Sequence, residues 1–483
     1  MQIFNISGMR IILFKFLKNL NWLSGSQWLI SISIIILLPA FYGCTTKEPS
    51  PPNIIFLLTD DQRWNAMGCM GNPDIQTPEM DKLAGNGVKF THAYVTTPIC
   101  AISRASILSG QYARKHKIND FKTHFTASAY QNTYPMQLKK AGYQIGFIGK
   151  YGVGQENDFP KEQYDYWACF PGQGQYWHKD SLGNDLHLTQ IMGNQTLEFL
   201  KNSPDNQPFC LSVSFKAPHV QDSNPNQFLF DSNYIDLYQD KTFPVPETGD
   251  SSYWNSFPEF FKNNNEARIR WHLRFDTPEK YQKSLRGYYR LIYGVDVQIG
   301  KIRKFLKETG KDKNTIIMLM GDNGFYLAEH GMAGKWYIHE ESVRVPFIIY
   351  DPRVQKEQKG LANDRMVLNI DVAPTILDYA GINIPETMQG KSVRNILYQK
   401  NTAWRNDFLF EHPFKYKTLP RSEGLVTEEW KYVRFIDRQE GYEWMYHTGT
   451  DPKEKKNLAE DEKFSDEKEK LKKRFEELSL QYK

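Results

Sequence analysis

Continuous apolar runs alternate with helical patterns through most of this chain. Each run has the length of a single strand and is apolar nearly throughout, which is typical of strands buried on both faces of a sheet. The runs are Asn53–Leu58, Tyr143–Ile148, Phe209–Phe215, Thr315–Met320 and Val345–Tyr350.

The clearest helical pattern covers Pro278–Glu308, where apolar residues recur every three or four positions until Gly310 stops the pattern. Strands that alternate with helices predict an α/β fold, with a large, mostly parallel sheet flanked by helices on both faces. Residues 221–275 lack this periodicity, so we expect a long loop region there, at the rim of a pocket.

The pattern changes near the C-terminus. Short strand-like runs, Phe408–Phe410 and Lys431–Ile436, precede a charged helical pattern that begins at Ser465. This segment is too short for a large core of its own. We therefore expect a catalytic α/β domain at residues 53–398 and a smaller α+β subdomain at residues 399–483.

Polar side chains suited to chemistry follow four of the apolar runs. The carboxyl ends of parallel strands meet at one edge of an open sheet, and ligands bind there. Each residue alone has an ordinary explanation as a turn or helix cap, but their convergence predicts a site at this edge. The residues are Asp60 and Asp61, Lys150, His219, and Asp322 with Asn323.

The oxygen-bearing members of this set predict a metal site. Asp60, Asp61, Asp322 and Asn323 offer hard oxygen ligands, which suit calcium, suit magnesium less well and do not suit zinc. One such ion would hold an anionic ester and the attacking oxygen together.

The cationic residues predict an anion clamp. Lys150, Lys335 and Arg104 are candidates to stabilise the charge that spreads over the oxygens of a transferring group. His219 is the candidate acid that protonates the leaving oxygen.

The N-terminus predicts export. A basic segment precedes an uncharged stretch from Asn19 to Thr46, as in a signal peptide; a membrane anchor is the alternative. Gly43 and Cys44 resemble the end of a bacterial lipoprotein signal. We expect a signal peptide at 1–43, a lipidated linker at 44–52 with the lipid on Cys44, and a location in the periplasm or on the cell surface.

Composition narrows the partners. The chain has 60 basic and 56 acidic residues and lacks a basic block, so we expect no nucleic-acid partner. Aromatic residues make up 14% of the chain, and Tyr and Trp can stack on sugar rings. Its five scattered cysteines predict neither a disulfide framework nor a zinc site.

Cys100 opens the segment CAISRASILSG, residues 100–110. A lone cysteine is usually a small buried residue, but this segment resembles the signature of the formylglycine-dependent (type I) sulfatases, Cys-x-Pro/Ala-Ser-Arg followed by Thr/Ser-Gly. Ile102 departs from the usual Pro or Ala. The resemblance implies that a sulfatase-maturation enzyme converts Cys100 to formylglycine, which also completes the calcium site. Its hydrate attacks sulfur, whereas an ordinary Ser or Cys would remain trapped as a sulfate ester.

Further segments carry the resemblance over almost the whole chain after residue 51. They imply an alkaline-phosphatase-like fold with a small C-terminal subdomain, and hydrolysis of sulfate esters on carbohydrate, such as sulfated glycans or glycosaminoglycans. The segments are Pro52–Gln62, Gly149-Lys150, Pro218-His219, Gly321–Gly324, Glu329–Gly331, Gly334–Trp336, Val345-Pro346 and Asp371–Thr375.

One position departs from the family pattern. Gly152 stands where the family often has a histidine that assists the oxidised nucleophile, and His116 is a nearby substitute in sequence. We predict a working enzyme in which release of sulfate is slowed. His412 and Arg421 are candidate sugar contacts, or else structural residues.

Two other functions fit the same residues. A phosphodiesterase or phosphonate monoester hydrolase of the same superfamily would use a similar metal cup. A non-catalytic, glycan-binding lipoprotein is the alternative outside enzymes, although the full set of site residues argues against a decayed site.

Overall fold

The computed structural model describes residues 50–398, 402–437 and 441–483. The predicted signal peptide and the lipidation site at Cys44 lie outside the described residues. Residues Pro51–Lys483 form one compact unit. Of the helices in the described part of the chain, none combines the length and apolarity needed to cross a membrane.

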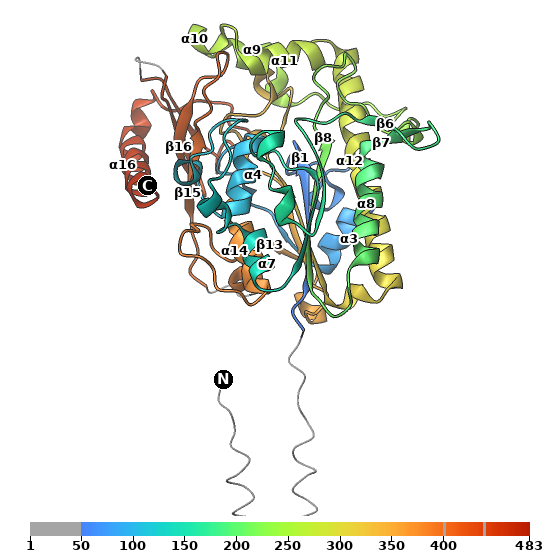
Figure 1. Ribbon diagram of the computed structural model, residues 1–483. Helices are drawn as coiled ribbons and strands as arrows, with labels where there is room; N and C mark the ends of the chain where they lie inside the picture. The colour runs from blue at the N-terminus through green and yellow to red at the C-terminus, as the bar shows by residue number, and fades with distance from the viewer. Residues whose placement is uncertain (1–49, 399–401, 438–440) are drawn as a thin grey trace, which may run out of the picture. The chain divides into compact units, whose positions relative to one another are not determined.

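An eight-stranded sheet forms the centre of this unit (Figure 1). The strands β9, β1, β8, β4 and β5 run parallel, as predicted, whereas β12 is antiparallel to β9. The strand order is β13 (Leu361–Asn363), β2 (Val88–Phe90), β12 (Phe347–Tyr350), β9 (Thr315–Gly321), β1 (Asn53–Asp60), β8 (Phe209–Pro218), β4 (Gln144–Lys150) and β5 (Tyr166–Phe170).

Helices cover both faces of the sheet, and the strands are therefore apolar on both sides (Figure 1). In β1, Ile55 and Leu57 pack in one core cluster, while Ile54 and Phe56 pack in the other. The first face carries α3 (Pro78–Asn86), α8 (Leu188–Asn202) and α12 (Pro278–Glu308); the second carries α4 (Cys100–Ser109), α7 (Tyr134–Lys140) and α14 (Val372–Tyr379).

Helix α12 has the bounds that the sequence predicts. The side chain of Thr277 caps its first turn by accepting a hydrogen bond from the Lys280 amide, and Pro278 occupies a position that needs no amide donor. Gly310, at φ 71°, follows the end of the helix.

A second, antiparallel sheet lies near the C-terminus, as predicted. It contains β15 (Asp407–His412), β16 (Ser422–Thr427), β17 (Trp430–Phe435) and β18 (Glu443–His447), and α16 (Ser465–Gln481) packs against it. Its core cluster includes Ile99, Ile102 and Tyr337 of the larger part, so the two parts share buried surface. The predicted boundary at residue 398 stays a prediction.

Residues 221–275 differ from the predicted loop. They contain α9 (Ser251–Asn255), α10 (Glu259–Lys262) and α11 (Glu266–Arg274). Trp254, Phe261 and Ala267 of these short helices are buried in the cluster shared with the C-terminal sheet. Tertiary packing thus stabilises helices too short to show a clear period in the sequence.

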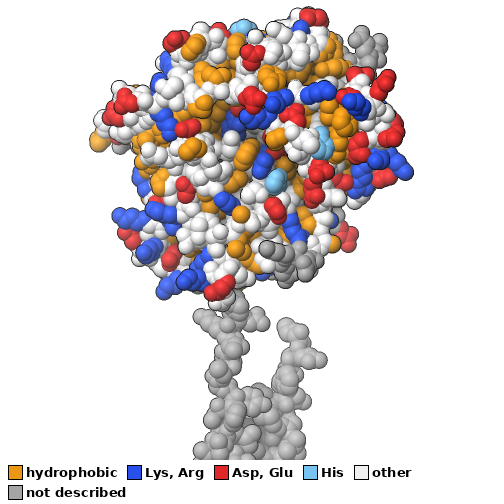
Figure 2. All heavy atoms as spheres, turned by 180° about the vertical axis from the view of Figure 1, so that it is seen from behind, with side chains coloured by type: hydrophobic (Ala, Val, Ile, Leu, Met, Phe, Trp, Pro, Cys, Tyr) orange, Lys and Arg blue, Asp and Glu red, His pale blue; other side chains and the backbone are white. Residues whose placement is uncertain are grey.

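Charged side chains of both signs are interspersed over the face of the molecule seen in Figure 2, with hydrophobic side chains between them. This mixture agrees with the nearly balanced count of acidic and basic residues.

Candidate active site

The carboxyl ends of the parallel strands deliver the predicted side chains to one place. Asp60 is the last residue of β1, and Asp61 follows with a left-handed backbone at φ 68°. The Asp61 amide donates to Oδ1 of Asp322 at 3.1 Å, and the Tyr288 hydroxyl donates to the Asp61 carbonyl at 2.7 Å. These bonds hold an unfavourable backbone conformation, of the kind that often marks a functional site.

Three cations face three carboxylates here. Lys150 bonds to Asp60, and Lys335 bonds to Asp61. Nε of Arg104 donates to Oδ2 of Asp322 at 2.9 Å. All are buried, and we call them, together with Asn323 and His219, the charged cluster. Because each charge has an opposite partner, burial of the whole set is tolerated.

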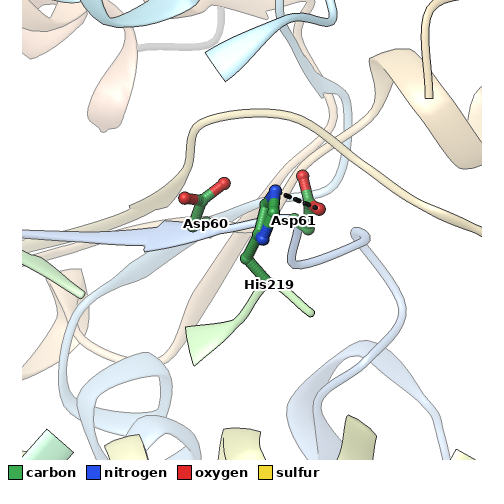
Figure 3. Close-up of side chains that lie close together, drawn as sticks. All are labelled: Asp60, Asp61 and His219. Atoms are coloured by element: carbon green, nitrogen blue, oxygen red, sulfur yellow. Dashed lines mark ion pairs between the residues drawn. The ribbon is translucent and has the colours of Figure 1, made fainter. Parts of the chain in front are cut away.

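Oxygen atoms in this cluster are left free to bind a cation. Oδ1 of Asp60 and Oδ1 of Asn323 are buried without a hydrogen-bond partner among the described residues. Asp60, Asp61 and His219 offer ligand atoms that lie within 4.8 Å of one another (Figure 3). Unpartnered buried oxygens are rare, so the donor set fits a hard cation such as calcium.

The charges in the cluster shift one another's pKa values. Burial alone would raise the pKa of Asp60, but Lys150, His219 and Arg104 hold it well below its usual range. Burial, and then the charge of Asp60, raises the pKa of Asp322 to about 7. Asp60 therefore stays ionised, while Asp322 needs a further positive charge to remain fully ionised at neutral pH.

His219 follows β8 and points toward Asp61 (Figure 3). Its Nδ1 lies 2.6 Å from the Val220 carbonyl, so Nδ1 carries the proton and donates it there. Its Nε2 lies 3.6 Å from Oδ2 of Asp61. Burial lowers the pKa of His219 well below its usual value, so the imidazole is neutral, with Nε2 as the reactive nitrogen.

Cys100 is the first residue of α4 and is 2% exposed. It lines a pocket of about 260 Å³ together with His219 and Lys335. The described cysteines, Cys69, Cys100, Cys169 and Cys210, are all free. The structure thus brings the predicted nucleophile, anion clamp and metal ligands to one site.

Several residues of the pocket were not found from the sequence. They come from loops and short helices and do not directly follow any of the strands predicted from the long apolar runs. They are Phe121, Gln173, Asp222, Glu266, Arg270, Trp336, Phe414, Tyr416 and Leu419.

Gln173 is the missed residue with the most direct contact. Its Oε1 accepts a hydrogen bond from Nζ of Lys150 at 2.6 Å. It lies between Gly172 and Gly174, whose φ values of 60° and 67° are left-handed. The Pro-Gly-Gln-Gly sequence is the signal that could have indicated a tight turn around a functional side chain.

Arg270 and its partners form another part of the pocket. On α11, Nε of Arg270 lies 2.8 Å from Oε1 of Glu266, and a longer ion pair joins Arg270 to Asp222. These residues come from the predicted loop region, which therefore does reach the pocket, through helix α11 and, at Asp222, through a turn.

The family histidine has no direct replacement at Gly152. Gly152 has φ 74°, and a Cβ atom there would lie 2.8 Å from Cδ of Arg104. His116 is occupied elsewhere: its Nε2 contacts the Ser106 hydroxyl at 3.0 Å, and its Nδ1 accepts from the Ile118 amide at 3.0 Å. His116 does not line the pocket, so the structure does not support the idea that His116 takes over the role of the family histidine.

The suggested sugar contacts lie outside the pocket lining. His412 is fully buried at the end of β15, where burial lowers its pKa to about 4. Arg421 forms a two-point ion pair with Asp437. Their geometry indicates structural roles.

Comparisons with known proteins agree with this site. Residues 52–382 match the sulfatase family, and residues 328–481 match the C-terminal region of N-sulphoglucosamine sulphohydrolase. An N-acetylglucosamine-6-O-sulfatase of Bacteroides thetaiotaomicron is 29% identical, over 90% of this chain and 88% of its own length. An arylsulfatase of Clostridium perfringens is also 29% identical, over 86% of this chain and 92% of its own length.

Solved structures show the same fold. A protein in complex with its substrate, D-glucosamine-2-N,6-O-disulfate, has a TM-score of 0.76 at 26% identity, over 90% of this chain and 98% of the other. The phosphonate monoester hydrolase of Agrobacterium radiobacter has a TM-score of 0.74 at 18% identity, over 89% of this chain and 96% of the other, a likeness of fold alone. The family match and the named relatives agree: this chain belongs to the sulfatase family, whose members are sulfuric ester hydrolases.

Proposed function

We propose that this sulfatase removes sulfate from carbohydrate, with formylglycine made from Cys100 by a sulfatase-maturation enzyme. The observation that carries the proposal is the position of Cys100, which opens into a pocket beside Lys335 and His219 at the edge of the charged cluster. A relative named for N-acetylglucosamine-6-sulfate, and a structural neighbour that holds a disulfated glucosamine, favour an aminosugar substrate.

One calcium ion would be held by the oxygen ligands of the cluster. The two unpartnered oxygens on Asp60 and Asn323 support this assignment. Asp61, Asp322 and the matured residue 100 would complete the set. When bound, the ion supplies positive charge that orients the sulfate group.

The chain's own residues account for the remaining chemistry. A hydrated aldehyde at residue 100 has two hydroxyls on one carbon: one oxygen bonds to sulfur as the sugar oxygen leaves, and the other then forms the carbonyl that expels sulfate. Lys150, Lys335 and Arg104 stabilise the negative oxygens of the transferring group. Nε2 of His219 takes up the proton that the attacking hydroxyl releases and passes it to the sugar oxygen as the bond between that oxygen and sulfur breaks.

The location of the enzyme follows from its N-terminal sequence. Export with a lipid on Cys44 would place it where polymeric glycans are accessible. Cys44→Ala should release the protein from the membrane fraction or block processing. Mature protein that still begins at Met1 would contradict lipidation.

The test uses the full chain produced with and without a maturation enzyme. Mass spectrometry of the peptide that contains Cys100 should show formylglycine only in the matured sample. That sample should release sulfate from N-acetylglucosamine-6-sulfate and act faster on an aryl sulfate than on the matching aryl phosphate. Equal sulfatase activity with unmodified thiol at Cys100 would refute the assignment.

A further inference from the structure

A row of three aromatic rings, two exposed and one half-buried, borders the pocket. Phe121 is 39% exposed and Tyr416 is 49% exposed, and both line the same pocket as Cys100. Phe414 lies between them: its ring centroid is 5.3 Å from that of Phe121 and 5.5 Å from that of Tyr416. We call Phe121, Phe414 and Tyr416 the aromatic ridge. Contiguous exposed apolar side chains of this kind mark binding surfaces.

The ridge is built from two distant parts of the chain. Phe121 follows the short helix α5 (Ala113–His116), whereas Phe414 and Tyr416 lie between β15 and β16 of the C-terminal sheet. The rings of Phe414 and Tyr416 are nearly parallel, at 13°. Because Phe414 covers one face of Tyr416, the opposite face remains available. The C–H face of a sugar ring packs on such a surface.

The two segments that carry the ridge are strongly basic. Residues 115–123 and 413–419 contain five lysines and one aspartate, and all five lysines are exposed. The nearby acids are already engaged: Glu411 and Glu423 bind Arg114, and Asp120 accepts two backbone amides. In the part of the chain that the structure describes, no carboxylate pairs with any of these five lysines, so the ridge is flanked by positive charge that complements a polyanion.

The size of the pocket limits what fits inside it. Sites for drug-sized ligands span roughly 300–1,000 Å³, and this pocket has about 260 Å³. The pocket is thus small for an oligosaccharide, and we expect the sugars next to the one that is desulfated to lie at its rim. The aromatic ridge is part of that rim.

We propose that the aromatic ridge binds the sugar next to the one that is desulfated, and that the preferred substrate is an anionic, sulfated oligosaccharide rather than a monosaccharide. The proposal rests on the proposed function, because the ridge borders the same pocket. Phe121, Phe414 and Tyr416 supply stacking, and the flanking lysines attract the sulfated chain.

The experiment compares two probes on matured protein. The first is N-acetylglucosamine-6-sulfate. The second is a heparin-derived tetrasaccharide with a 6-sulfated glucosamine at its end. The ratio of kcat/KM, tetrasaccharide over monosaccharide, should exceed one in the wild type and fall about tenfold in Phe121→Ala and Tyr416→Ala, since 1.4 kcal/mol is a factor of ten. The control is Ile384→Ala: Ile384 is also 39% exposed but lies outside the pocket lining, and its ratio should equal that of the wild type.

The charge is tested separately. Lys415→Gln/Lys417→Gln should raise KM for the tetrasaccharide several-fold at low salt and make KM less dependent on salt. Lys304→Gln, at an exposed lysine of α12, serves as the control. A wild-type ratio of one or less, or ridge variants that leave the ratio unchanged, overturns the proposal. Loss of all sulfate release from both probes would instead count against the proposed function.

Discussion

The charged cluster and the aromatic ridge border one pocket but are built in opposite ways. In the cluster, side chains from the ends of neighbouring strands are buried, and Lys150, Lys335 and Arg104 each have a carboxylate partner. In the ridge, Phe121 and Tyr416 are exposed loop side chains, and the flanking lysines have no carboxylate partner among the described residues. The comparison suggests that the rigid sheet fixes the bond-breaking chemistry, while surface loops set the length and charge of the substrate.

The largest effect should come from the nucleophile. Cys100→Ala in protein from a maturation strain should lower sulfatase activity by at least about 10⁴-fold, because the attacking group is lost. Thermal unfolding should change little, which separates chemistry from folding. Cys69→Ala, at another free cysteine, is the matched control and should keep activity.

Metal removal should have the next largest effect. Exhaustive chelation should lower activity about 10²–10⁴-fold, and added calcium should restore it. Asp322→Ala should lose both bound calcium, measured by elemental analysis, and activity. Asp378→Ala, on the surface-facing side of α14, should lose neither. Full activity after chelation would show that Lys150, Lys335 and Arg104 stabilise the sulfate group without a metal ion.

Gln173 combines features of the two regions: it is exposed, like most of the aromatic ridge, yet it bonds to Lys150 of the buried charged cluster. Gln173→Ala should lower kcat about tenfold with less effect on KM, since Lys150 keeps its bond to Asp60 but loses one partner. Gln173→Glu should restore part of the loss by accepting the same bond. Gln175→Ala in the same loop is the control, and an equal loss there would indicate a general effect on the loop.

Two buried histidines that do not line the pocket, His412 and His330, should affect the stability of the protein but not its activity. Burial lowers the pKa of His412 to about 4 and that of His330 to about 4. In the unfolded chain the pKa of a histidine is about 6.5, so as the pH falls the unfolded chain binds a proton at each histidine before the folded chain does. The contribution of each histidine is therefore complete above pH 6.5 and is lost as pH falls toward 4, by at most about 3 kcal/mol.

Urea unfolding at pH 7.5 and pH 5 checks this expectation. His412→Asn should show a smaller loss of stability between the two pH values than the wild type, with activity at pH 7.5 retained. His272→Asn, at an exposed histidine, should match the wild type. If His412→Asn abolished activity without lowering stability, His412 would have a role in the active site, contrary to this expectation.

The sequence predicts the regular parts of the molecule best. Long apolar runs gave the parallel strands, and the period of Pro278–Glu308 gave α12 residue for residue. The direction of β12 was not predictable, because an apolar run carries no information about its neighbours. Strands of three residues, such as β2 and β13, are too short to show a pattern.

In the site, too, residues at the ends of regular strands were predictable from the sequence, whereas residues on loops were not. Asp60, Lys150 and Asp322 were found because strand ends converge at one edge of the sheet. The rim was missed because loops bring together Phe121 and Phe414, which are far apart in the sequence, and no local pattern indicates that contact. The two roles considered for His412 could not be distinguished from the sequence, because burial cannot be read from a lone histidine.

Gly152 limits which side chains can be accommodated at this position of the site. A side chain there would meet Arg104, whose guanidinium is bonded to Asp322 and to the Lys150 carbonyl. Introducing a histidine by one substitution would thus displace an arginine on which the rest of the site depends. A histidine at this position therefore requires compensating changes elsewhere in the site, so its effect depends on the residues around it.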